Sequence, residues 1–291
     1  MKVLVIGGTG YIGAGVVRRL RTAGHSPVAL VRTAPAGPRS VETRVGDLSA
    51  PDTLRAAVTP DIDAVVHAAT PTGDWAVDRA AIDVLTESLA GRTLLYLSGV
   101  WVLGETSGTA TESTPPRPVE LVAGRPALEE RVLGAAGVRG IVVRPGIVHG
   151  HGGGLLAMMV GWAQDAGTGR FVGDPTVRWP MVHVDDLAEL VVIALDRAEP
   201  GAVLHGVTEP AVPVKELAAA ADVAAGCSGG AEAWPETDAA RELGAAFAAA
   251  LALDQEVVSP AARRLGWTPT GRPAVADLLE GSYLVDPVSA V

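Results

Sequence analysis

The chain has 291 residues and a formal net charge of −10, and 48% of its residues are hydrophobic while only 4% are aromatic. Ala, Val, Leu and Ile can therefore form a large core, but no Lys/Arg run or aromatic-interleaved basic stripe is present, so we expect no nucleic-acid partner. The single cysteine, Cys227, excludes an internal disulfide framework and a cysteine-based zinc site.

Short apolar runs followed by helical patterns dominate the first half of the chain. The first run, 3–6, is too short for a signal-peptide core and no later run reaches transmembrane length, so we expect a cytoplasmic protein with no membrane partner. Buried strands are predicted at 3–6, 28–31, 43–45, 64–67, 94–97 and 140–143, and helices before Gly24, at 51–58 and at 127–136. This alternation predicts a parallel sheet with right-handed crossovers.

The second half shows a looser pattern. A turn is predicted at 144–146, a flexible joint at 152–154, irregular structure at 155–180, a helix at 187–195 and a mainly helical tail after 212. The predicted fold class is α/β, a Rossmann-type doubly wound parallel sheet with a smaller C-terminal substrate-binding region. We assign 1–150 to dinucleotide binding and 151–291 to a substrate-binding lid that is partly interleaved with the sheet.

A glycine motif joins the first strand to the first helix. Gly8-Thr9-Gly10-Tyr11-Ile12-Gly13 fits G-x-G-x-x-G, and Gly7 extends it. Glycines allow the sharp turn and the close approach of a pyrophosphate, while the helix N-terminus offers free N–H groups. The motif therefore predicts a dinucleotide site; the residues expected in it are Gly7, Gly10, Tyr11, Ile12 and Gly13.

The end of the second strand distinguishes NAD from NADP. An NAD site usually has an acidic residue there, but this strand ends Val31-Arg32-Thr33 and no acid follows before Glu42. A guanidinium can pair with a 2′-phosphate in bidentate fashion. Arg32 therefore predicts NADP(H) as the cofactor.

Several motifs in order resemble the extended short-chain dehydrogenase/reductase family, which contains nucleotide-sugar epimerases and dehydratases. They are the glycine motif, Gly46-Asp47-Leu48, His67-Ala68-Ala69, Arg144-Pro145-Gly146 with Val148 and Gly150, and the segment 182–188. The resemblance covers nearly the whole chain. It implies that Asp47 contacts adenine and that Leu48 and Ala68 line the cofactor site.

The family's catalytic Ser/Thr-Tyr-Lys set is not matched. The family tyrosine exchanges a proton with the substrate oxygen, and the lysine lowers its pKa. Aligning the family's helix glutamate with Glu129 puts Leu121 and Arg125 at these positions, and aligning it with Glu130 puts Val122 and Pro126 there. Neither register provides the tyrosine. The family's dehydratases also use an Asp-Glu pair, and Val100 and Trp101 stand at those positions, so the usual oxidation–elimination mechanism is not expected.

Three residues are candidates to replace the set. His149 ends a strand, where ligands bind in open α/β sheets, and imidazole titrates near neutral pH. Ser98 lies one residue before the position that aligns with the catalytic hydroxyl and can donate a hydrogen bond to a carbonyl. Arg125 can stabilise an oxyanion, although a guanidinium is a poor proton donor.

A metal site is not predicted, because His149 and His151 have no clear third ligand and the resemblance assigns His183, Asp185 and Asp186 to ordering a loop and capping a helix. A largely apolar substrate pocket is predicted instead; its expected residues are Trp101, Trp162, Arg178 and Trp179.

Three functions follow from these patterns. The first is an NADP(H)-dependent oxidoreductase that acts on a small, largely apolar carbonyl or hydroxyl substrate through a non-standard proton donor. The second is a non-redox enzyme on the same scaffold, such as an isomerase, cyclase or eliminase. The third is a non-catalytic NADP(H) sensor that resembles the NmrA-like regulators. The resemblance also implies a homodimer through helices near 79–90 and 127–136.

Overall fold

A computed structural model describes residues 1–34 and 41–284 of the chain. The first half contains β1 (Lys2–Ile6), α1 (Tyr11–Thr22), β2 (Ser26–Val31), β3 (Glu42–Val45), α2 (Pro51–Ala57), β4 (Ala64–His67), α3 (Trp75–Ser88), β5 (Thr93–Leu97), the 3-10 turns η1 (Val100–Leu103) and η2 (Glu120–Val122), α4 (Arg125–Leu133) and β6 (Arg139–Pro145). The predicted strands and helices of this half are all present, with ends shifted by up to three residues.

The second half contributes to the main sheet and also forms a unit of its own. Its elements are β7 (Ile147–His149), α5 (Gly154–Ala166), β8 (Gly169–Val172), β9 (Arg178–His183), α6 (Val184–Arg197), β10 (Ala202–Gly206), β11 (Glu209–Pro213), α7 (Val214–Ala224), β12 (Ala231–Trp234), α8 (Glu236–Leu243), α9 (Ala245–Leu251), α10 (Pro260–Arg264) and α11 (Ala274–Glu280).

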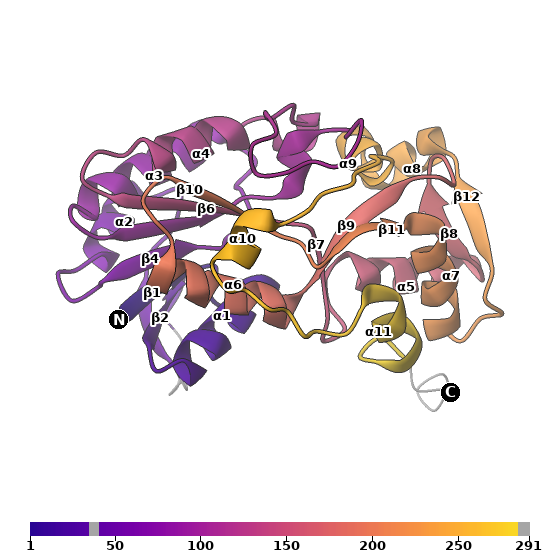
Figure 1. Cartoon of the computed structure of the whole chain (residues 1–291), viewed down its shortest axis with the longest axis horizontal. Coiled ribbons are helices and arrows are strands. Elements are labelled where there is room, and N and C mark those ends of the chain that lie inside the picture. The colour runs from indigo at the N-terminus through magenta and orange to yellow at the C-terminus, as the bar shows by residue number, and fades with distance from the viewer. Residues whose placement is uncertain (35–40, 285–291) are drawn as a thin grey trace.

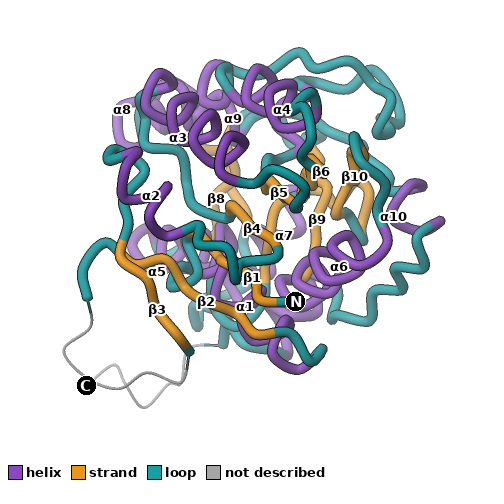
Figure 2. Tube along the Cα trace, turned by 90° about the vertical axis from the view of Figure 1, so that its left-hand side faces the viewer, coloured by secondary structure: helices purple, strands orange, loops and turns teal. Residues whose placement is uncertain are grey.

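The main sheet has seven strands in the order β10-β6-β5-β4-β1-β2-β3, and every neighbouring pair is parallel. Its two faces are covered by α1 and α6 on one side and by α2, α3 and α4 on the other, which gives three layers (Figures 1 and 2). Strands buried on both faces are continuously apolar, as Val3-Leu4-Val5-Ile6 is. The predicted α/β class with a doubly wound parallel sheet is confirmed.

The second unit lies to the right in Figure 1 and packs around a separate apolar cluster. A three-stranded sheet, β11-β9-β7, and the parallel pair β12-β8 form its framework. The chain interleaves the two units, because β10 joins the main sheet beside β6 and α6 packs on α1. Residues beyond 150 therefore complete the main sheet and one of its helical layers, as well as forming the second unit.

Two local predictions are wrong. Segment 155–180 is ordered as α5, β8 and the start of β9, and Arg144-Pro145 continues β6 rather than forming a turn. The predicted helix 127–136 begins earlier, at Arg125, and ends at Leu133.

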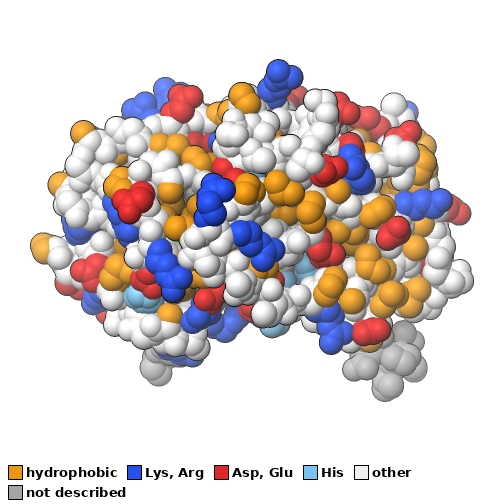
Figure 3. All heavy atoms as spheres, viewed as in Figure 1, with side chains coloured by type: hydrophobic (Ala, Val, Ile, Leu, Met, Phe, Trp, Pro, Cys, Tyr) orange, Lys and Arg blue, Asp and Glu red, His pale blue; other side chains and the backbone are white. Residues whose placement is uncertain are grey.

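No helix among the described residues is long and apolar enough to cross a bilayer. Basic and acidic side chains are interspersed over the face shown in Figure 3.

Candidate functional site

The glycine loop between β1 and α1 is shaped for close backbone approach. Gly7 has φ +79°, a left-handed conformation that favours glycine, and a Cβ there would lie 2.7 Å from the Ala69 backbone. A Cβ at Gly13 would lie 2.0 Å from the Gly7 carbonyl oxygen. Helix α1 then begins at Tyr11 with no side-chain cap from Gly10, so its first-turn N–H groups remain available to an anion.

A groove of about 860 Å³ runs along this loop. Every residue predicted to bind the cofactor lines it: Gly7, Gly10, Tyr11, Ile12, Gly13, Arg32, Asp47, Leu48 and Ala68. Arg32 and Asp47 lie after β2 and β3, whereas the segment 68–72 follows β4. Hydrogen bonds from the Ser49 side chain and backbone lower the pKa of Asp47, and the charge of Arg32 lowers it further. The groove therefore has the lining that a dinucleotide requires.

Three buried polar atoms without hydrogen-bond partners lie at the carboxyl ends of the neighbouring strands β4 and β5, and none of their residues lines the groove itself. They are Ser98 Oγ, Arg125 Nε and His67 Nδ1. Arg125 Nη1 donates to the carbonyl oxygen of Leu97, the residue before Ser98, at 3.0 Å. The His67 ring lies 5.5 Å from that of Tyr96, and burial, with Arg125 nearby, lowers the pKa of His67 to about 4. Unpaired buried polar groups are costly, so this cluster is a candidate for substrate contacts.

The two glutamates of α4 that define the alignment registers differ in burial. Glu129 is buried and its carboxylate pairs with the Arg144 guanidinium of β6, whereas Glu130 is exposed. Glu129 therefore ties α4 to the main sheet. In the register that aligns the family's glutamate with Glu129, the tyrosine and lysine positions fall on Leu121, which is exposed, and on Arg125.

His149 lies apart from this cluster. Its strand, β7, belongs to the three-stranded sheet, so the prediction that it ends at the ligand-binding edge of the main sheet is wrong. The side chain is 0% exposed, with Nδ1 3.4 Å from Asp277 Oδ2 and Nε2 3.9 Å from Glu209 Oε2. Burial lowers the pKa of His149 to about 4, so its imidazole is neutral near pH 7.

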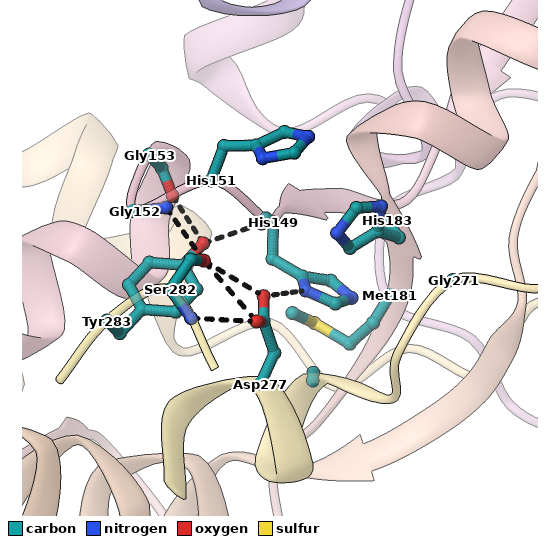
Figure 4. A network of polar contacts seen from close by, with 12 residues as sticks. His149, His151, Gly152, Gly153, Met181, His183, Gly271, Asp277, Ser282 and Tyr283 are labelled. Atoms are coloured by element: carbon teal, nitrogen blue, oxygen red, sulfur yellow. Dashed lines mark hydrogen bonds and ion pairs between the residues drawn. The ribbon is translucent and has the colours of Figure 1, made fainter. Parts of the chain in front are cut away.

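A hydrogen-bond network beside His149 joins the C-terminal segment, here residues 277–283, to the turn after β7 (Figure 4). The Tyr283 hydroxyl accepts from Gly150 N and donates to Gly153 O, both at 2.7 Å. From the other side, the Tyr11 hydroxyl of the glycine loop donates to Gly150 O at 2.8 Å. The C-terminal segment and the dinucleotide groove are therefore connected through one turn.

The four predicted pocket residues do not line the dinucleotide groove, and the three tryptophans among them pack in or against one apolar cluster. Trp179 is 2% exposed and donates its indole N–H to Leu251 O, so it is a core residue and that prediction is wrong. Trp101 and Trp162 are partly buried against the same apolar cluster. Arg178 is held by Asp254 and Glu256 and is not free for an anion.

The segment 182–188 has the structural role that the resemblance implies. His183 Nδ1 accepts from Asp185 N at 3.2 Å and caps α6, and Asp186 Oδ1 accepts from the backbone of Thr270 and Gly271. Asp185 and His183 also approach His151, with the three potential ligand atoms within 4.8 Å of one another. His151 Nε2 and Asp185 Oδ2 form a hydrogen bond of 2.7 Å. The expectation that His151 has no further potential ligand nearby is therefore wrong, because His183 and Asp185, distant in sequence, lie beside it.

These features define a Rossmann-type dinucleotide-binding protein. Residues 3–205 match the model of the NAD dependent epimerase/dehydratase family, and the chain belongs to this family. An uncharacterized protein of Schizosaccharomyces pombe is 30% identical over 97% of this chain and 100% of its own length. The 2′-dehydrokanamycin reductase of Streptomyces kanamyceticus is 32% identical over 75% of this chain and 64% of its own. The structure of human epimerase family protein SDR39U1 with NADPH superposes with a TM-score of 0.73 at 23% identity, covering 98% and 100% of the two chains.

Sequence reasoning missed two parts of the site. His67 belongs to a family motif, but the available signal is its place at the end of a buried strand, where a polar side chain can reach the ligand edge of the sheet. The carboxylates of Asp254 and Glu256 were missed because no local pattern links them to Arg178, 76 and 78 positions away.

Proposed function

We propose that the protein is an NADP(H)-dependent oxidoreductase that acts on a small, largely apolar carbonyl or hydroxyl substrate. The observation that carries this proposal is a set of buried, unpaired atoms at the carboxyl ends of β4 and β5, namely His67 Nδ1, Ser98 Oγ and Arg125 Nε. His67 is followed directly by Ala68, which lines the dinucleotide groove. Buried donors without a partner in the protein can donate hydrogen bonds to a substrate carbonyl oxygen, which gains negative charge as the carbonyl is reduced.

The groove fits the cofactor because Gly7 and Gly13 have no room for a Cβ, which brings the backbone of the loop close together, and because the α1 N-terminus is uncapped. Gly7 to Gly13 would hold the pyrophosphate, Asp47 the adenine and Arg32 the 2′-phosphate. When bound, the nicotinamide supplies the exchange of a hydride with the substrate carbon.

Ser98 and Arg125 would act on the substrate oxygen. The Ser98 hydroxyl and the Arg125 Nε–H donate hydrogen bonds to it, and the guanidinium charge stabilises the developing alkoxide. A guanidinium does not release its proton near neutral pH, and the lowered pKa of His67 keeps that imidazole neutral. The proton that completes the alcohol therefore comes from solvent through the Ser98 hydroxyl.

The names of two similar proteins support this proposal. One relative is named as a reductase, and the SDR39U1 structure holds NADPH. A non-redox enzyme is the second candidate, because neither register provides the family's tyrosine and an isomerase or eliminase needs no net hydride transfer. An NADP(H) sensor would bind the nucleotide with no turnover at all.

The test is NADPH oxidation followed at 340 nm with a panel of small ketones and aldehydes. We expect turnover by the wild-type chain and a loss of about 100-fold or more in kcat/KM for Arg125→Gln, with a loss of about tenfold for Ser98→Ala. Arg131→Gln is the matched control, because Arg131 lies on the same helix but pairs with Asp83 on the surface. Binding of NADPH without oxidation of any substrate would refute the redox proposal and leave the other two functions.

A further inference from the structure

The one arginine of the predicted pocket is neutralised by the chain itself. Arg178 Nε and Nη2 donate to Asp254 Oδ1 and Oδ2 at 3.0 and 2.8 Å, and Nη1 donates to Glu256 Oε2 at 3.0 Å. All three guanidinium nitrogens are thus engaged, and one positive charge faces two negative charges. We call these three side chains the Arg178 cluster; its net charge at neutral pH is −1.

The Arg178 cluster lies beside the turn that follows Ser98. Gln255, between the two acids, is 1% exposed, and its Nε2 donates to Val100 O at 2.9 Å and to Gly104 O at 2.8 Å. These carbonyls belong to the first residue and the C-cap of the η1 turn, which begins two residues after Ser98. The side chains of Arg178, Asp254 and Glu256 remain 35%, 28% and 31% exposed, so they are open to solvent and not sealed in the core.

Charge is divided unequally between the two halves of the chain. Residues 1–150 carry 15 basic and 14 acidic side chains, whereas residues 151–291 carry 8 basic and 19 acidic ones. The nearly neutral half holds the groove for the anionic dinucleotide. The half expected to contact substrate accounts for the negative charge of the protein, and its field opposes a second anion.

We propose that the substrate carries no phosphate or carboxylate and is an uncharged or amine-bearing carbonyl compound, with the Arg178 cluster as the specificity-determining element. An anionic substrate would meet the net negative charge of the cluster and would have to displace a carboxylate to reach the guanidinium. This inference rests on the proposed function and names its substrate class. It also separates the protein from the nucleotide-sugar enzymes of its family, whose substrates carry a diphosphate.

The test compares three ketones with one carbon skeleton that end in an amine, a hydroxyl or a carboxylate. Their binding to the protein–NADPH complex is measured by calorimetry, and their reduction is followed at 340 nm. We expect the wild-type chain to bind the carboxylate at least about tenfold more weakly than the other two. UDP-glucose at millimolar concentration should not compete with the amine or the hydroxyl compound.

A gain of function distinguishes the Arg178 cluster from the general charge. Glu256→Gln, and Asp254→Asn with Glu256→Gln, should each improve carboxylate binding relative to the hydroxyl compound, the double variant by about tenfold. Glu242→Gln removes an equal charge from the exposed end of α8 and should leave the ratio unchanged. Circular dichroism verifies that each variant is folded, and the single variant suffices if the double one is not.

The outcomes separate this inference from the proposed function. Equal or preferred binding of the carboxylate by the wild-type chain would overturn the inference, even if ketones are reduced. An equal response of the Glu242 control and the cluster variants would overturn the role of the Arg178 cluster. Binding in the expected order without reduction of any ketone would instead refute the redox chemistry and retain the charge selection.

Discussion

Tyr283→Phe tests the connection between the C-terminal segment and the turn after β7. Removing the hydroxyl deletes the acceptor of the buried Gly150 N–H and the donor to the part-buried Gly153 carbonyl, both bonds of 2.7 Å. A buried N–H left unpaired costs about 1–3 kcal/mol, and the carbonyl, which water can reach in part, about 0.5–1.5 kcal/mol. We therefore expect the free energy of unfolding to fall by about 2–4 kcal/mol.

Urea denaturation followed by circular dichroism measures this change, with no nucleotide present. Tyr11→Phe is the matched control, because it deletes only the single 2.8 Å bond to Gly150 O and should cost about 1 kcal/mol. Both hydroxyls act on Gly150, so the double variant should depart from additivity. A loss below about 0.5 kcal/mol for Tyr283→Phe would show that the network does not stabilise the fold.

Three further predictions concern the groove and the buried charges. In Gly13→Ala the new Cβ would lie 2.0 Å from Gly7 O, so the glycine loop would have to move, and we expect the folded variant to lose nucleotide binding. An unchanged nucleotide affinity in calorimetry would contradict the described loop. Glu129→Gln should lower the free energy of unfolding by about 3–5 kcal/mol, since the buried Arg144 charge loses its counter-ion, and a neutral result in urea denaturation would refute this. The pKa of His149 is lowered to about 4 in the folded protein, so the unfolded chain binds the proton more readily. The free energy of unfolding should therefore fall by roughly 2–3 kcal/mol as the pH drops from about 6.5 towards 4. His149→Gln should flatten this pH dependence, measured by urea denaturation at a series of pH values.

The sequence predicts the dinucleotide half well because its signals are local. Strand 64–67 has the predicted bounds, because a short apolar run that is buried on both faces is typical of a strand inside a parallel sheet. The glycine motif likewise places its own backbone and the groove beside it. These features depend on neighbours within a few residues.

The second unit was predicted poorly because its structure depends on distant partners. Helix α5 is apolar on most sides and contains Gly161, so it has no clear helical period, and β8 is stabilised by pairing with β12, some sixty residues later. The chain leaves the main sheet after β6, so that β7, which carries His149, pairs with β9 in another sheet, and no local pattern shows this change. The neutralisation of Arg178 likewise depends on a distant segment, 254–256.

The most direct test of the central claim is calorimetric titration of the wild-type chain and Arg32→Ala with NADPH and with NADH. Arg32 lines the groove beside Asp47, and a charge-assisted pair with the 2′-phosphate contributes about 1.5–3 kcal/mol. We expect wild-type binding to favour NADPH by roughly 10- to 100-fold, and Arg32→Ala to lose that preference while its affinity for NADH is unchanged. Failure of both nucleotides to bind, or a preference that survives Arg32→Ala, would contradict the account.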